Sequence, residues 1–206
     1  MKKVIFPVIV AAILWFVMFS PWTKEYVNFW ITMGFAGTTL TLMSAFLGEN
    51  FKRQFSLSVK DVLIGLSSAA ILYLIFYLGD FFASLLFDFA KEQVGNIYSM
   101  KEGENKVFLV LLLLLLVGPA EEIFWRGYVQ RTLGTKYGEW TALILTTLIY
   151  TLVHIWSFNF MLIMAALVCG AFWGLLYKYN KNLVTLIISH AVWDVSVLIL
   201  FPIIAP

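Results

Sequence analysis

Charged side chains are scarce in this sequence of 206 residues. Asp, Glu, Lys and Arg make up 13% of it and hydrophobic residues 62%, whereas a soluble domain has about 25% charged residues. A folded chain of this composition would present a largely apolar surface. This excludes an ordinary water-soluble protein and indicates that the solvent is a lipid bilayer. The net charge of +2 is too small to favour nucleic-acid binding.

Cysteine and histidine are also rare. Cys169 is the only cysteine, so no disulfide can form within the chain, and a small apolar packing residue is its simplest interpretation. The two histidines are His154 and His190. Neither belongs to a His-Glu-x-x-His pattern, so the sequence carries no local signature of a zinc protease.

Long hydrophobic runs, by contrast, are abundant. A membrane span needs about 20 apolar residues, and the segments that qualify are 4–20, 27–47, 62–79, 107–133, 140–157, 159–178 and 182–203. No small-x-small cleavage site follows the first run, so we interpret it as an uncleaved span rather than a signal peptide. The sequence therefore predicts an all-α, polytopic membrane bundle of about seven transmembrane helices, with residues 1–206 in a single membrane domain.

The residues after the third span are amphipathic. Asp80, Ser84 and Asp88 fall near one helical face, and phenylalanine and leucine cover the rest. This pattern predicts an extension that lies in the headgroup region, although one long tilted helix over 62–90 would also fit. The next segment, 91–106, is rich in charged and polar residues, which predicts a flexible outer loop.

The basic residues indicate an orientation. With the N-terminus in the cytoplasm, seven spans would place on the cytoplasmic side all of the 14 Lys and Arg residues except Lys24, Lys91, Lys101 and Lys106. Basic residues are enriched in the cytoplasmic loops of membrane proteins. We therefore expect an integral membrane protein with a cytoplasmic N-terminus.

Three of the spans nevertheless contain ionisable residues. An ionised group at the centre of a span costs roughly 2.5–3.5 kcal/mol, so each is unexpected in a purely structural helix. Their positions lie ~12–21 Å from the cytoplasmic ends of their helices. Helices four, five and seven could therefore converge on one buried polar site. The residues are Glu121, Glu122 and Arg126 in the fourth span, His154 in the fifth, and His190 and Asp194 in the seventh.

A packing role has to be weighed against a catalytic one. Glu122 and Arg126 are four residues apart and could form an ion pair that neutralises itself. Glu121 projects about 100° away from Glu122 on a helix, so Arg126 cannot easily serve both carboxylates. A buried carboxylate without its own counter-ion suits a general base. Together with two histidines, which can activate water, bind metal or stabilise an oxyanion, the combination favours function.

Gly118 and Pro119 come one turn before the two glutamates. Proline lacks an amide hydrogen, so we expect the helix to kink there and to leave carbonyl groups free near the site.

Three short motifs resemble a known family. The run EEIFWRG matches the pattern E-E-x-x-x-R, YTLVH matches F-x-x-x-H with Tyr150 in place of phenylalanine, and HAVWD matches H-x-x-x-N or H-x-x-x-D. In this order, on three separate helices, the motifs resemble the CPBP (Abi) family of intramembrane proteases, which is related to the type II CaaX prenyl protease. The resemblance covers a catalytic core at about 107–203.

The resemblance implies a role for each motif residue. Glu121 would be the general base that activates water, assisted by His154, and Arg126 would hold Glu122. His190 and Asp194 would face the scissile carbonyl and stabilise its oxyanion. The family has been described both as metalloproteases and as metal-free, glutamate-dependent enzymes, so zinc bound by Glu121, His154 and His190 remains an alternative.

Asp194 replaces the asparagine of the prenyl-protein processors. An amide can donate a hydrogen bond to an oxyanion, whereas an ionised aspartate cannot. Asp194 would therefore be protonated, orient His190, or bind a metal. Aspartate is an accepted variant in bacterial members of the family, which favours the cytoplasmic membrane of a bacterium and weakens the expectation of a prenylated substrate.

The function expected from the resemblance is hydrolysis of a peptide bond in a membrane-associated peptide or protein, with or without a lipid modification. One alternative is a non-catalytic membrane protein for bacteriocin immunity or scaffolding. Another is a proton-coupled transporter, because buried Glu, His and Asp also form proton relays. The expected partners are the substrate and the lipid bilayer, without nucleic acid, and the charged loops favour substrate entry from the cytoplasmic side.

Overall fold

The computed structural model describes residues 2–49 and 51–203, and these residues form helices and connecting turns without a β-strand. Six helical segments are long and apolar enough to cross a membrane, and a further apolar helix, α1, is slightly shorter. The prediction of a polytopic helix bundle is therefore confirmed. The main helices are α1 (Lys2–Phe19), α2 (Phe29–Leu47), α3 (Val59–Leu86), α4 (Ala90–Ser99), α8 (Glu139–Val153), α9 (Phe160–Asn180) and α10 (Leu183–Val195).

The segment between α4 and α8 is one continuous helical path, Lys106–Tyr137. It consists of α5 (Lys106–Leu112), α6 (Gly118–Glu121) and α7 (Arg131–Tyr137), joined by π-helical turns over Leu113–Val117 and Glu122–Gln130. The helix therefore continues through Pro119, and the disturbance expected there takes the form of widened turns on both sides of α6. Such turns often occur at functional sites.

The third span differs from the prediction. Helix α3 runs without interruption for 28 residues, to Leu86, so the predicted change to an interfacial segment after residue 79 is wrong and the alternative of one long helix is closer. The segment 91–106 is not simply a flexible loop, since most of α4 falls within it. Contacts explain why α4 is ordered: Gln93 accepts a hydrogen bond from Asn159, and the Trp30 indole donates to the carbonyl of Met100.

Side chains define where many of the helices begin. In five cases a polar side chain accepts a hydrogen bond from a backbone amide in the first turn, which satisfies a donor that has no partner within the helix. Four of these N-cap residues are asparagine, so the capping signal was present in the sequence at the polar breaks between apolar runs. The residues are Asn28, Ser58, Asn105, Asn159 and Asn182.

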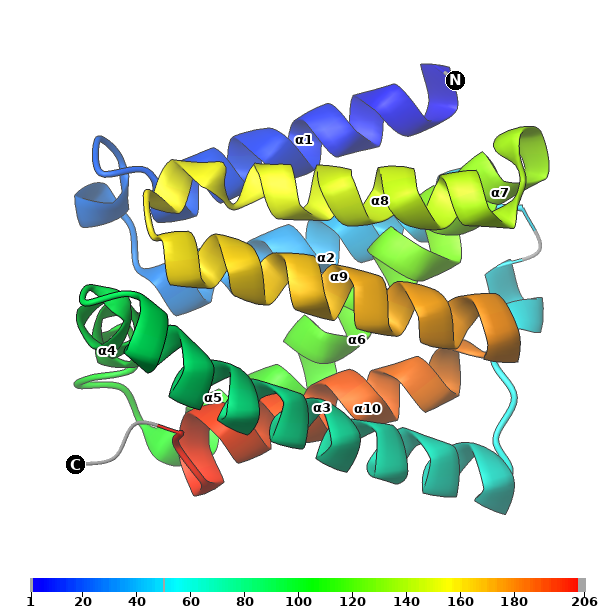
Figure 1. The fold of residues 1–206 in the computed structure, drawn as a ribbon. Helices are drawn as coiled ribbons and strands as arrows, with labels where there is room; N and C mark the ends of the chain where they lie inside the picture. The colour runs from blue at the N-terminus through cyan, green and yellow to red at the C-terminus, as the bar shows by residue number, and fades with distance from the viewer. Residues whose placement is uncertain (1, 50, 204–206) are drawn as a thin grey trace.

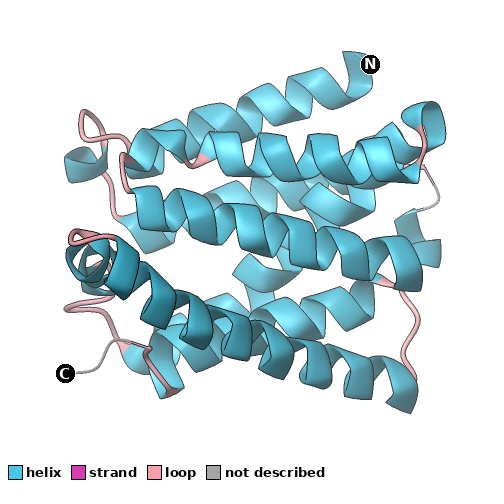
Figure 2. Cartoon of the chain, in the orientation of Figure 1, coloured by secondary structure: helices cyan, strands magenta, loops and turns pink. Residues whose placement is uncertain are grey.

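The helices lie side by side, and the connections gather at two ends of the bundle (Figures 1 and 2). The end that carries α7 and the start of α1 is called the α7 end, and the opposite end, which carries α4, is called the α4 end. Helix α10 packs mainly on α3, and α8 on α9. The stretch from α5 to α7 crosses between these pairs (Figure 1), so residues near its middle lie at the centre of the bundle.

Close packing against α10 depends on two glycines. A Cβ atom on Gly65 would lie 2.8 Å from the Cβ atom of Ile188, and one on Gly118 would lie 3.0 Å from the Cα atom of Ala191. Side chains at these positions would push α10 away from α3 and α6. These contacts therefore set the position of the helix that carries His190 and Asp194.

Candidate active site

The ionisable residues of the three motifs lie at the centre of the bundle and are connected through hydrogen bonds. Residues of α6 and of the following π-helical turn meet Tyr150 of α8 and His190 of α10. All six side chains are at least nine-tenths buried. The structure therefore brings together the residues that the motifs suggested, namely Glu121, Glu122, Arg126, His154, His190 and Asp194.

Glu122 is the link between three helices. Its Oε1 atom accepts a hydrogen bond from Nη1 of Arg126 at 2.8 Å and from Nδ1 of His190 at 2.7 Å. Arg126 also donates through Nη2 to the carbonyl oxygens of Cys169 and Gly170 in α9. The Glu122–Arg126 ion pair neutralises itself, and its hydrogen bonds tie the fourth span to α9 and α10.

Glu121 has a different environment from its neighbour. Its Oε2 atom accepts a hydrogen bond from the hydroxyl group of Tyr150 at 2.7 Å, and no described cation forms an ion pair with it. Tyr150 occupies the position of phenylalanine in the second motif, and its added hydroxyl group provides this bond. Glu121 is therefore a carboxylate held in place without a permanent counter-ion, as the spacing of the two glutamates suggested.

His154 has partners for both ring nitrogens. Its Nε2 atom lies 3.0 Å from the indole nitrogen of Trp15 in α1, and its Nδ1 atom lies 2.8 Å from the carbonyl oxygen of Tyr150. An indole N–H group can only donate and a carbonyl can only accept. These two bonds are therefore satisfied together by a neutral His154 with its proton on Nδ1. Sequence reasoning missed Trp15, which gives no local sign of a polar role.

His190 lies between two carboxylates. Its Nδ1 atom donates to Glu122, and its Nε2 atom lies 3.5 Å from Oδ2 of Asp194. The imidazole ring stacks on the indole of Trp173 with 3.7 Å between centroids and 16° between planes. The indole is itself held by a hydrogen bond to Ser189. The ring therefore has a fixed orientation, and Nε2 is the nitrogen that remains directed toward Asp194.

A cavity of about 560 Å³ adjoins these residues. Glu121, Tyr150, His154, His190 and Asp194 contribute to its wall, and most of the other lining residues are apolar. The lining comes from the parts of α1, α2, α3, α8, α9 and α10 that lie toward α4, from α4 itself, and from Leu113, Val117 and Glu121 of the fourth span (Figure 1). The cavity thus extends from the polar cluster toward the α4 end. This does not support the expected entry of substrate from the end where α1 begins.

The wall of the cavity at the α4 end includes α4 and the last turn of the final span. The hydroxyl group of Tyr98 donates to the carbonyl oxygen of Val197, and the ammonium group of Lys101 donates to that of Leu198. Burial, together with the nearby charge of Lys106, lowers the pKa of Lys101. Both contacts fall on the π-helical turn Ser196–Leu200, where they fix α4 over the end of the final span.

The arrangement does not fit the zinc site considered above. Among the described residues, no group of three or more His, Cys, Asp or Glu side chains is placed to hold a metal ion. His154 explains part of this result, because the hydrogen bonds to Trp15 and to the carbonyl of Tyr150 occupy both of its ring nitrogens. Glu121, His154 and His190 therefore line one cavity without forming a set of metal ligands.

Comparison with known proteins agrees with the motifs. A family model described as "Type II CAAX prenyl endopeptidase Rce1-like" matches residues 103–196, a range that contains all three motifs. No curated protein and no solved structure matches the chain significantly. The matched range begins after α4, so α1, which carries Trp15, lies outside it. Residues 103–196 are thus similar to the Rce1-like type II CAAX prenyl endopeptidases, a family of membrane proteases, in agreement with the resemblance of the three motifs.

Proposed function

We propose that this protein is an intramembrane endopeptidase in which Glu121 activates water to hydrolyse a peptide bond. The observation that carries the proposal is the contrast between the two adjacent glutamates. Glu122 is neutralised by Arg126 and bound to His190, whereas the Glu121 side chain has one hydrogen bond among the described residues, from Tyr150, and borders the cavity. A buried carboxylate of this kind can take a proton from water beside a bound substrate.

The reaction divides into two steps. Glu121 removes a proton from water while the oxygen attacks the peptide carbonyl, and the carbonyl oxygen becomes a tetrahedral oxyanion. The Nδ1 atom of His190 is bound to Glu122, so Nε2 is the ring nitrogen available on the cavity side. When Nε2 is protonated, its N–H group would donate a hydrogen bond to this oxyanion. The C–N bond then breaks, and Glu121 passes its proton to the departing amine. Asp194, beside Nε2, orients His190 in this scheme.

His154 has a different role in this scheme from that of a second base. Its Nε2 lone pair accepts from Trp15, so it does not receive the proton of the attacking water while that bond exists. Its Nδ1 donor instead holds the carbonyl of Tyr150. His154 therefore positions the turn that presents the Tyr150 hydroxyl group to Glu121.

The cavity suggests the class of substrate. Its mainly apolar wall and its position inside the bundle suit an apolar or membrane-associated segment of a peptide or protein. Basic residues are concentrated at the α7 end, which favours a cytoplasmic location for that end in a bacterial membrane. With this orientation, substrate would reach Glu121 through the half of the bundle that faces away from the cytoplasm.

The function can be tested with purified protein in proteoliposomes. We expect cleavage of membrane-associated peptides from a library that contains lipid-modified and unmodified sequences, with each product identified by mass spectrometry. Cleavage should persist after treatment with a strong chelator, because the residues that the structure describes offer no set of metal ligands. Loss of activity on chelation would refute the glutamate-only mechanism. A failure to cleave any peptide would favour the non-catalytic immunity or scaffolding role.

Replacement of Trp15 by phenylalanine tests the role of α1. The variant keeps an aromatic ring but removes the donor to His154, so we expect about tenfold slower cleavage, the equivalent of one lost hydrogen bond. The ¹⁵N chemical shift of His154 Nε2 should change as well, which loss of packing alone would not cause. Trp22→Phe is the control, because Trp22 is 62% exposed. Equal activity and an unchanged shift in Trp15→Phe would rule out this role.

A further inference from the structure

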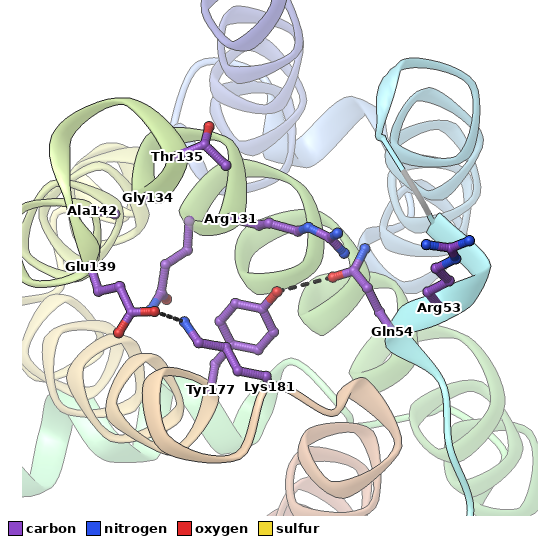
Figure 3. A pocket seen from close by; sticks show the side chains of 10 residues that line it. Arg53, Gln54, Arg131, Gly134, Thr135, Glu139, Ala142, Tyr177 and Lys181 are labelled. Atoms are coloured by element: carbon purple, nitrogen blue, oxygen red, sulfur yellow. Dashed lines mark hydrogen bonds and ion pairs between the residues drawn. The ribbon is translucent and has the colours of Figure 1, made fainter.

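A second cavity lies at the α7 end, about 460 Å³ in volume, and it shares no lining residue with the cavity beside Glu121. Its walls come from the turn Phe51–Gln54, the start of α7, the start of α8 and the end of α9 (Figure 3). Unlike the first cavity, it is lined largely by polar and charged side chains. The lining includes Arg53, Gln54, Gln130, Arg131, Glu139, Tyr177 and Lys181.

The charges around this cavity do not balance. Lys181 forms an ion pair with Glu139 at 2.6 Å, so these two neutralise each other. The guanidinium groups of Arg53 and Arg131 form no hydrogen bond or ion pair with any described residue. Figure 3 shows the Arg131 side chain reaching toward Gln54, with Arg53 on the other side of Gln54. Two uncompensated guanidinium groups therefore border one cavity.

Neutral polar groups also lie in the wall. Gln54 is 4% exposed, and its Oε1 atom accepts from the hydroxyl group of Tyr177, which leaves its amide N–H groups as donors. Gln130 is also 4% exposed, and it donates through Nε2 to the carbonyl of Gly174. The Oε1 atom of Gln130 is buried and has no partner among the described residues. This atom is shielded from the cavity, so a ligand there would meet the amide N–H groups of Gln54 and not the Oε1 atom of Gln130.

These groups together define the chemistry of a ligand. Two guanidinium groups and an amide donor suit the oxygens of a phosphate, which arginine binds in a bidentate manner. A phosphate ester supplies these oxygens, and a cavity of about 460 Å³ is large enough for a group of this size.

The location of the cavity favours a lipid as the source of that group. It lies beside α7, where α8 begins and α9 ends, at the level at which a membrane-spanning bundle meets the headgroups. Basic pockets between helices at the cytoplasmic side of membrane proteins bind anionic headgroups. We propose that this cavity binds the phosphate group of an anionic glycerophospholipid, with Arg53 and Arg131 on the phosphate and the amide of Gln54 as a further donor.

The test measures lipid binding directly and does not depend on peptidase activity. Purified protein is titrated with phosphatidylglycerol, and bound lipid is counted by native mass spectrometry. The double variant Arg53→Gln/Arg131→Gln should bind at least about tenfold more weakly. The matched control is Lys52→Gln/Lys136→Gln, which removes the same charge from the same end at exposed residues outside the cavity lining and should bind as the unmodified protein does.

Two further binding measurements identify the ligand. Phosphatidylcholine, whose cationic trimethylammonium group is repelled by the two guanidinium groups, should bind more weakly than phosphatidylglycerol. Free glycerol phosphate should compete with phosphatidylglycerol only at much higher concentration, because it lacks the acyl chains. Competition by glycerol phosphate at concentrations similar to those of the lipid would assign the site to a soluble phosphate ester. Equal loss of binding in the double variant and its control would overturn the proposal.

Discussion

Replacing Glu121 with glutamine is expected to reduce peptide cleavage by about a thousandfold while the protein remains folded in the membrane. Glutamine has nearly the same shape, and its carbonyl oxygen can still accept the hydrogen bond from Tyr150. It cannot take a proton from water, and a positioned general base typically contributes about 10²–10⁴ to the rate. The measurement is the cleavage rate in proteoliposomes, with the melting temperature as the check on folding.

The control for this prediction is Glu92→Gln, the same chemical change at an exposed position in α4. Its activity should equal that of the unmodified protein. If Glu121→Gln retained activity within a fewfold, Glu121 would not be the base, and the two adjacent glutamates would have to be explained by packing. Because each outcome is read against the melting temperature, an inactive variant that has merely unfolded is recognised as such.

The fold could be predicted in outline because the bilayer imposes simple rules. A span must be apolar and about 20 residues long, and the polar breaks contain the asparagines that cap several helices. The error at α3 has a physical reason. Asp80 and Ser84 are polar, but neither interrupts an α-helix, so a change in polarity marked a change in surroundings and not the end of the helix at residue 79.

The candidate site could be predicted from the sequence only where its residues are close together in the chain. Pairs such as Glu122 with Arg126, or His190 with Asp194, are four residues apart and share a helix face. Trp15 and His154 are 139 positions apart, so the sequence gives no sign of their contact. A tryptophan in an apolar helix is usually interpreted as a packing residue. The second cavity was missed for a similar reason, since Arg53 and Arg131 were counted only as charges that orient the chain in the membrane.

Removal of Arg126 is expected to have the largest effect on stability. In Arg126→Leu the carboxylate of Glu122 would stay buried and lose its permanent counter-ion, although His190 would still donate to the same oxygen atom. The carbonyls of Cys169 and Gly170 would lose a donor as well. Breaking a buried ion pair from one side costs about 3–5 kcal/mol. We therefore expect a large fall in the melting temperature and in the yield of inserted protein.

The double variant Glu122→Gln/Arg126→Leu separates charge from packing. It removes the buried carboxylate that the single variant leaves uncompensated, so it should be more stable than Arg126→Leu even though it carries one more substitution. Groups in direct contact show coupling of about 0.5–3 kcal/mol, which a comparison of the four melting curves can resolve. If the two changes proved additive, Arg126 would act through its contacts with α9 alone, and the ion pair would not be what joins the fourth span to the rest of the bundle.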